Sequence, residues 1–109
     1  MLNINGFGCV SALGNNPEAF LRGLRQGISP CVDTEFSRLD GSVLTTPAFI
    51  GAKPDAAGLI EPRKLRRMFR LVRMVAVSAR QALLMAGIDP SNLDPSRIGV
   101  VIGTAFGAL

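Results

Sequence analysis

The most informative absence in this sequence of 109 residues is histidine, which does not occur at all. Histidine is the usual general base near neutral pH and the commonest ligand of zinc, so a site of either kind would need other residues. Tryptophan and tyrosine are also absent. No spacing of cysteine or acidic residues is typical of a metal site, so we expect neither a metal ion nor a cofactor.

Cysteine is scarce, and neither cysteine has the surroundings of a nucleophile. Cys9 lies in an apolar stretch, where a thiol usually serves as a small buried hydrophobe, and Cys31 lies in a turn-rich region. A reactive thiolate needs a neighbouring cation or a histidine partner, which neither position offers. We therefore expect no catalytic role for either residue.

The sequence has no apolar run of about 18 residues, as a membrane span would need, and no signal-peptide pattern. We therefore expect a cytoplasmic protein that does not bind membranes. Hydrophobic residues make up 48% and charged residues 18% of the chain, which is a globular composition. Because this apolar share is high for one small domain, we expect something else to cover part of its surface.

Alternating strand-like and helix-like patterns predict an α/β fold. Residues 1–10 are predicted to form a strand in which Gly6 and Gly8 let another backbone come close. Residues 17–26 are predicted to form a short helix that begins after an asparagine cap and ends at Gly27.

Residues 29–59 are rich in turn formers and weakly patterned. Within them, residues 43–50 are consistent with a strand, and Pro47 would place it at a sheet edge. The strongest pattern predicts one long amphipathic helix over residues 62–86, ended by Gly87. Its apolar stripe has eight members: Leu65, Met68, Phe69, Val72, Val75, Ala76, Ala79 and Leu83.

Residues 98–103 form a continuous apolar run, which is typical of a strand buried on both faces of a parallel sheet. Such a sheet needs more strands and covering helices than 109 residues supply. We therefore expect residues 1–109 to form one segment of a larger domain, with an incomplete sheet and the remainder of the fold absent.

Three stretches resemble the motifs of one family, in the family's order and spacing. Residues 4–14 (INGFGCVSALG) resemble a first strand and turn, usually I-T-G-x-G-x-V-S-P-x-G. Residues 66–70 (RRMFR) resemble the start of a long helix, usually R-R-M-D-R, with Phe69 in place of aspartate. Residues 97–107 (RIGVVIGTAFG) resemble R-[IV]-G-V-[VI]-x-G-S-x-x-G. Together they resemble the β-ketoacyl synthases of the thiolase superfamily, over essentially the whole chain.

The resemblance implies a thiolase-like layered α/β fold, of which this chain would be the first part of the N-terminal half. Members of the family are usually homodimers. They catalyse decarboxylative Claisen condensation of an acyl thioester with malonyl–acyl carrier protein, in fatty-acid or polyketide synthesis. They use one cysteine and two histidines, and all three positions lie beyond the matching region. The resemblance therefore implies that this chain is inactive on its own.

Two other interpretations stay open. The chain could belong to a non-catalytic, synthase-like partner of the chain-length-factor type, which keeps the fold, lacks the nucleophile and forms a heterodimer. It could also be a stand-alone binding module, although the predicted buried final strand argues against a stable isolated fold.

The best functional signal is the stretch from Arg63 to Arg80, which contains seven basic residues and no acidic one. On one long helix these cations would crowd the N-terminal half, where the helix dipole disfavours them. No acidic residue three or four positions away would offset their repulsion. The pattern indicates either a solvated helix face or a surface for an acidic partner.

The resemblance places Arg63, Arg66 and Arg67 where related synthases dock acyl carrier protein, and we group Arg70 with them. Nucleic acid is not expected at this surface, because no helix-turn-helix, zinc or aromatic-platform pattern accompanies the arginines.

Phe106 follows the apolar run 98–103, at the strand end where open α/β sheets place ligand sites. The resemblance implies that this position borders the acyl pocket, where a phenylalanine would favour shorter or differently directed acyl chains. Plain core packing is the equal alternative.

Overall fold

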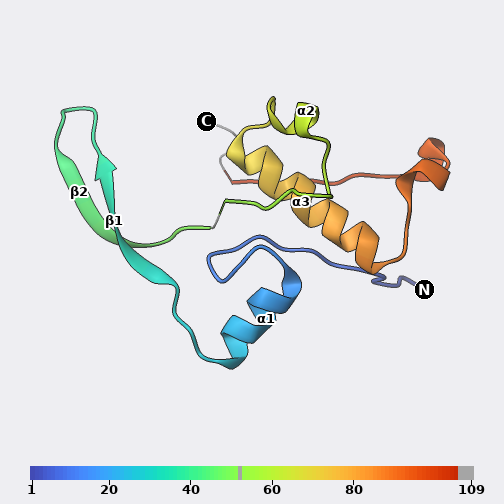
Figure 1. Ribbon diagram of the computed structural model, residues 1–109, viewed down its shortest axis with the longest axis horizontal. Coiled ribbons are helices and arrows are strands. Elements are labelled where there is room, and N and C mark those ends of the chain that lie inside the picture. The colour runs from blue at the N-terminus through green and yellow to red at the C-terminus, as the bar shows by residue number, and fades with distance from the viewer. Residues whose placement is uncertain (52, 106–109) are drawn as a thin grey trace.

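The computed structural model describes residues 1–51 and 53–105 and has a mixed α/β architecture (Figure 1). The elements follow in the order α1 (Pro17–Arg25), β1 (Cys31–Ser37), β2 (Val43–Phe49), α2 (Pro62–Leu65), α3 (Arg70–Met85), η1 (Pro90–Asn92) and η2 (Pro95–Arg97). The sheet of the described residues has two antiparallel strands, β1 and β2. The α/β class is therefore confirmed, while no parallel pairing occurs in this part of the chain.

Helix α1 forms as the sequence predicts. The side chain of Asn16 accepts a hydrogen bond from the backbone N–H of Ala19 at 2.8 Å, which caps the helix start. At the other end Gly27 has a φ of 65°, a left-handed conformation that glycine adopts readily. The N–H of Ile28 then donates to the carbonyl of Gly23 at 3.0 Å, closing a Schellman motif.

The hairpin of β1 and β2 projects from the rest of the molecule (Figure 1). Its register runs from Cys31 opposite Phe49 to Ser37 opposite Val43. Both strands are edges of a two-stranded sheet, so the missing N–H of Pro47 is tolerated and its predicted edge position is confirmed. The sequence did not predict β1, because its polar and apolar residues alternate only weakly.

The N-terminal segment forms no strand, so the prediction for residues 1–10 is wrong in that respect. The predicted close approach to another backbone is confirmed, although the neighbour is helix α3. A Cβ added to Gly8 would lie 2.0 Å from the carbonyl oxygen of Ser78, and one on Gly6 would lie 2.2 Å from that of Ala82. Only glycine fits this contact.

Gln81 of α3 holds the same segment through its side-chain amide. Its Oε1 accepts from the backbone N–H of Cys9 at 3.0 Å, and its Nε2 donates to the carbonyl of Asn15. One side chain therefore joins α3 to residues on both sides of the turn that precedes α1.

The single helix predicted over residues 62–86 is wrong, because the chain leaves the helical conformation between α2 and α3. Phe69 is extended there, with φ −65° and ψ 161°. The guanidinium of Arg73 reaches back across the break, donating to the carbonyls of Met68 at 2.9 Å and Leu65 at 2.7 Å. Carbonyls at a helix end need such partners, so this arginine stabilises the interruption.

Helix α3 ends near the predicted glycine, with Ala86 as C-cap and Gly87 after it at a φ of 66°. Its buried face differs from the predicted stripe. Val77, which lies outside that stripe, is fully buried, whereas Val72 and Val75 of the stripe are 42% and 39% exposed. The helix turns this other face inward because the glycine-containing segment packs directly against its backbone.

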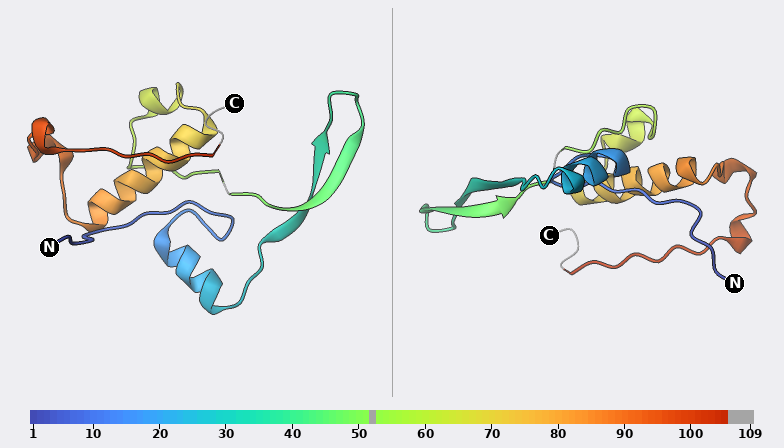
Figure 2. Two further views of the ribbon diagram at one scale, coloured as in Figure 1. Left: turned by 180° about the vertical axis from the view of Figure 1, so that it is seen from behind. Right: turned by 90° about the horizontal axis from the view of Figure 1, so that it is seen from below.

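Residues 98–103 were predicted to be a buried strand, and in the described structure they are neither a strand nor buried. Val100 is 78% and Val101 is 98% exposed. Figure 2 shows this segment as an extended stretch with no strand beside it. A strand buried in a parallel sheet needs neighbours on both edges, and the described part of the chain provides none.

Candidate functional site

Four exposed cations gather at α2 and the turn after it, and we call them the basic surface: Arg63, Lys64, Arg66 and Arg67. They line an open hollow of about 520 Å³, whose other lining residue is Glu61. Within the described residues, none of the four side chains forms a hydrogen bond or an ion pair. The charges are therefore available to a partner.

The break between α2 and α3 removes the unfavourable helix-dipole effect that the sequence predicts for the basic residues on one long helix. Helix α2 is a single turn of four residues, so Arg63 and Lys64 lie near both of its ends and its dipole neither favours nor disfavours them. The predicted crowding at the start of a long helix is therefore wrong. Mutual repulsion among the four neighbouring cations remains, because no ion pair in the described chain offsets it.

Three other basic residues of the same stretch bind backbone carbonyls. Arg70, which the sequence grouped with the docking residues, is exposed but donates through Nη2 to the carbonyl of Gly51. Arg80 donates to the carbonyl of Leu59 at 3.1 Å, and Arg73 bridges the helix break as described above. These three side chains hold loops around α2, whereas the four side chains of the basic surface are exposed.

Phe69 lies two residues beyond Arg67, the last residue of the basic surface, and is the N-cap residue of α3. Its side chain is 76% exposed and forms no capping hydrogen bond. The apolar spacing of one continuous helix predicts Phe69 on the apolar stripe, so its exposure could not be foreseen from the sequence. The docking group predicted from the sequence also omits Lys64, although the residue stands beside Arg63 in the sequence.

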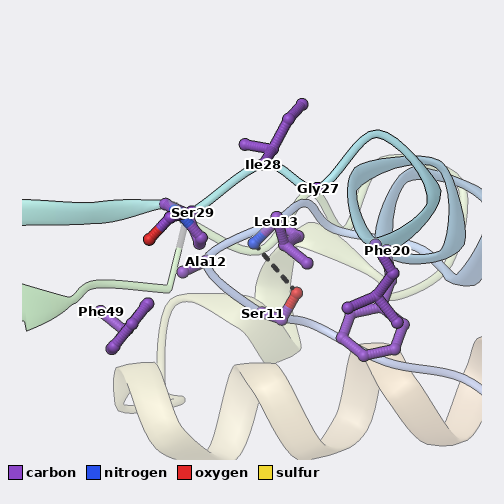
Figure 3. A pocket seen from close by; sticks show the side chains of 10 residues that line it. Ser11, Ala12, Leu13, Phe20, Gly27, Ile28, Ser29 and Phe49 are labelled. Carbon is purple, nitrogen blue, oxygen red and sulfur yellow. Dashed lines mark hydrogen bonds between the residues drawn. The ribbon is translucent and has the colours of Figure 1, made fainter.

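A separate apolar hollow of about 520 Å³ lies between the first turn, the end of α1 and the base of the hairpin (Figure 3). Leu13, Phe20, Ile28 and Phe49 contribute to its wall, and no charged side chain lines it. Such a lining suits apolar packing rather than acid–base chemistry.

Both cysteines, Cys9 and Cys31, are free thiols. Burial raises the pKa of Cys9, and the Glu18 carboxylate raises it further. A raised pKa keeps the thiol protonated near neutral pH, whereas the thiolate is the nucleophile.

Phe106 lies outside the described residues, so its position beside an acyl pocket stays a prediction. Among the described residues, no helix combines the length and apolar character that crossing a membrane requires.

The chain matches one known protein family over almost its whole length. The sequence model described as "Beta-ketoacyl synthase, N-terminal domain" matches residues 2–108. The chain belongs to this family. The three motifs noted in the sequence thus fall in a match that spans nearly all residues, and the predicted family is confirmed.

Three individual relatives illustrate what this β-ketoacyl synthase chain is similar to. It is 30% identical over 106 residues to 3-oxoacyl-[acyl-carrier-protein] synthase 1 of Escherichia coli K12, covering 96% of this chain and 26% of that protein. It is 44% identical over 48 residues to the tetracenomycin polyketide synthase ketoacyl synthase alpha subunit of Streptomyces glaucescens, covering 44% of this chain and 11% of that protein. It is also 28% identical over 107 residues to nodulation protein E of Rhizobium meliloti, covering 95% of this chain and 25% of that protein.

The chain therefore spans about a quarter of the length of the curated relatives that it matches from end to end. No solved structure matches it.

Proposed function

We propose that this chain is the N-terminal part of a 3-oxoacyl–acyl carrier protein synthase. The whole enzyme would join an acyl thioester to malonyl–acyl carrier protein, releasing carbon dioxide and a free thiol and leaving a 3-oxoacyl thioester. The family match over residues 2–108 carries this proposal. The chemistry would depend on a cysteine and two histidines elsewhere in the longer protein, since this chain contains no histidine and Cys9 has a raised pKa.

The part of the function that we assign to this chain is docking of acyl carrier protein on the basic surface. Four exposed cations without partners among the described residues are what an acidic protein would bind, and the name of the E. coli relative includes the acyl carrier protein. Attraction of this kind mainly raises the association rate and fixes orientation. Arg70 would contribute less, because its guanidinium binds the Gly51 carbonyl.

The proposed reaction is tested by a condensation assay on the 109-residue chain beside the longer protein, with acyl and malonyl carrier proteins as substrates. We expect 3-oxoacyl product from the longer protein alone. Product from neither would favour the non-catalytic, synthase-like partner. Product from the chain by itself would contradict our placement of the chemistry.

The docking role is tested by reversing two charges of the basic surface in the longer protein, Arg66→Glu with Arg67→Glu. We expect affinity for acyl carrier protein to fall on the order of tenfold to a hundredfold at low ionic strength, and to depend less steeply on salt. Isothermal titration at two salt concentrations measures both effects. The melting temperature should stay nearly constant, because neither side chain has a partner in the described chain.

A matched control reverses Arg25 and Arg38, which are exposed and belong to α1 and the hairpin turn. This variant has the same net charge as the test variant. If both double variants bind the carrier protein equally well, net charge and not the basic surface governs binding, and the docking proposal fails.

A further inference from the structure

We propose that Phe69 is an apolar anchor for the partner that docks on the basic surface, so that this surface recognises an acidic protein with an apolar patch rather than negative charge alone. This inference rests on the proposed docking function and adds the residue that would supply affinity independent of charge.

The first observation is exposure. Phe69 is 76% exposed, which makes it the most exposed phenylalanine among the described residues; Phe49 follows at 67% and Phe7 at 50%. A single exposed apolar residue is ordinary on a protein surface. This one differs because it stands two residues after the last of four cations that repel one another and have no partners among the described residues.

The second observation is the backbone position of Phe69. It is the N-cap of α3, where serine, threonine, aspartate or asparagine would bond a free N–H of the first turn. Phe69 forms no such bond, and the first turn of α3 contains no acidic residue that would suit the helix dipole. Phe69 thus carries two local costs in stability, an exposed aromatic ring and an uncapped helix start. No contact within the described chain offsets them. Such inconsistencies are concentrated at functional sites.

Geometry allows one partner to contact both features. Phe69 is three residues from Arg66 and two from Arg67, so its Cα lies within about 11 Å of theirs along the chain. A protein partner typically covers about 800 Å² on each side, which is ample for this separation.

The two features would act differently on binding. Aromatic residues are enriched among the few that dominate an interface, whereas exposed charges around them chiefly accelerate encounter. The basic surface should therefore set the association rate and the salt dependence, and Phe69 should slow dissociation at any salt concentration. A polyanion without an apolar patch would use only the cations.

The test compares Phe69→Ala with Phe69→Leu in the longer protein, using phosphopantetheinylated acyl carrier protein as the ligand and poly-glutamate as a charge-only probe. We expect Phe69→Ala to weaken carrier-protein binding about tenfold, by the same factor at low and high salt. Phe69→Leu should retain most of the affinity. Binding of poly-glutamate should not change in either variant. The melting temperature of each variant should equal that of the unmodified protein.

Two results would overturn the inference. Unchanged carrier-protein affinity in Phe69→Ala would show that the ring does not contact the partner. Weaker binding together with a clear drop in melting temperature would show that Phe69 packs inside the longer protein. The Arg66→Glu, Arg67→Glu variant distinguishes a wrong anchor from a wrong docking surface. If only the anchoring role of Phe69 is wrong, this double variant still weakens carrier-protein binding.

Discussion

At the scale of single residues, Gln81 joins parts of the chain that are far apart in sequence. Its amide accepts from the N–H of Cys9 and donates to the carbonyl of Asn15, at the point where Gly8 leaves no space between the N-terminal segment and α3. These backbone groups are partly buried, and losing a partner there costs more than losing one in water. The side chain therefore fixes the segment that carries Cys9.

Replacing Gln81 by alanine tests this role. We expect the longer protein to lose about 1–3 kcal/mol of unfolding free energy, because two backbone groups lose their partners. Loosening the segment should also lower the raised pKa of Cys9 towards its ordinary value, giving more thiolate at a given pH and faster reaction with iodoacetamide. Denaturant unfolding measures the first effect, and mass spectrometry of the Cys9 peptide measures the second.

Gln81→Glu is the matched control for that experiment. A glutamate can still accept from the Cys9 N–H but cannot donate to the Asn15 carbonyl, so its effects should be smaller than those of alanine. If alanine changes neither stability nor the alkylation rate, the Gln81 contacts do not hold the segment in place.

At the scale of elements, the interruption between α2 and α3 decides which side chains face a partner. A continuous helix would have placed Phe69 on the apolar stripe and Arg73 on the basic face. The break instead exposes Phe69 and turns Arg73 back onto the carbonyls of Leu65 and Met68. The start of α3 is left without a side-chain cap, so the helix is weakest at this end.

Phe69→Asp should therefore strengthen the start of α3. An aspartate at an N-cap typically contributes about 0.5–2 kcal/mol relative to a side chain that cannot cap. In a synthetic peptide spanning residues 67–88, we expect higher helicity by circular dichroism than with phenylalanine, and no gain with Phe69→Leu. Equal helicity of the aspartate and phenylalanine peptides would mean that residue 69 is not the N-cap of this helix.

The hairpin is the other element with an unpartnered surface. In the observed register, Val32, Phe36, Leu44 and Ala48 share one face, and the first three are 54%, 43% and 40% exposed. Isolated two-stranded hairpins are marginally stable in water, so this face needs a covering layer.

At the scale of the whole molecule, the chain exposes more surface than a compact monomer of its mass. Its accessible area is 8796 Å², whereas a compact monomer of 11.5 kDa exposes about 5,800 Å². Its radius of gyration is 16.8 Å, against about 13 Å for a compact domain of this length. Among the described residues, the buried ones are Pro17, Gly23, Pro54, Ala56 and Val77.

We therefore expect the 109-residue chain on its own to unfold without a cooperative transition. Differential scanning calorimetry should give no sharp heat-absorption peak, and a dye that binds exposed apolar surface should fluoresce in the chain's presence at room temperature. The longer protein should show a sharp transition and little dye binding. A cooperative transition for the isolated chain, with a monomeric mass in sedimentation, would contradict this expectation.

Local signals in the sequence determined helix α1, the end of α3 and the family. Asn16 and Gly27 mark the limits of α1 because capping and left-handed glycine depend on neighbouring residues alone. The family motifs likewise stand in the sequence itself. The basic residues became a candidate docking group through the resemblance to that family, together with their lack of acidic neighbours.

Only the tertiary structure decided which of these residues are available. Among the described residues, Arg66 and Arg67 have no partners, whereas Arg70 and Arg73 bind carbonyls because the loop at Gly51 and the end of α2 come within their reach. The run 98–103 has the apolar character of a buried strand, but its burial depends on neighbouring strands that the described chain does not contain. Hydrophobic pattern sets what a segment can bury, and the surrounding chain sets whether it is buried.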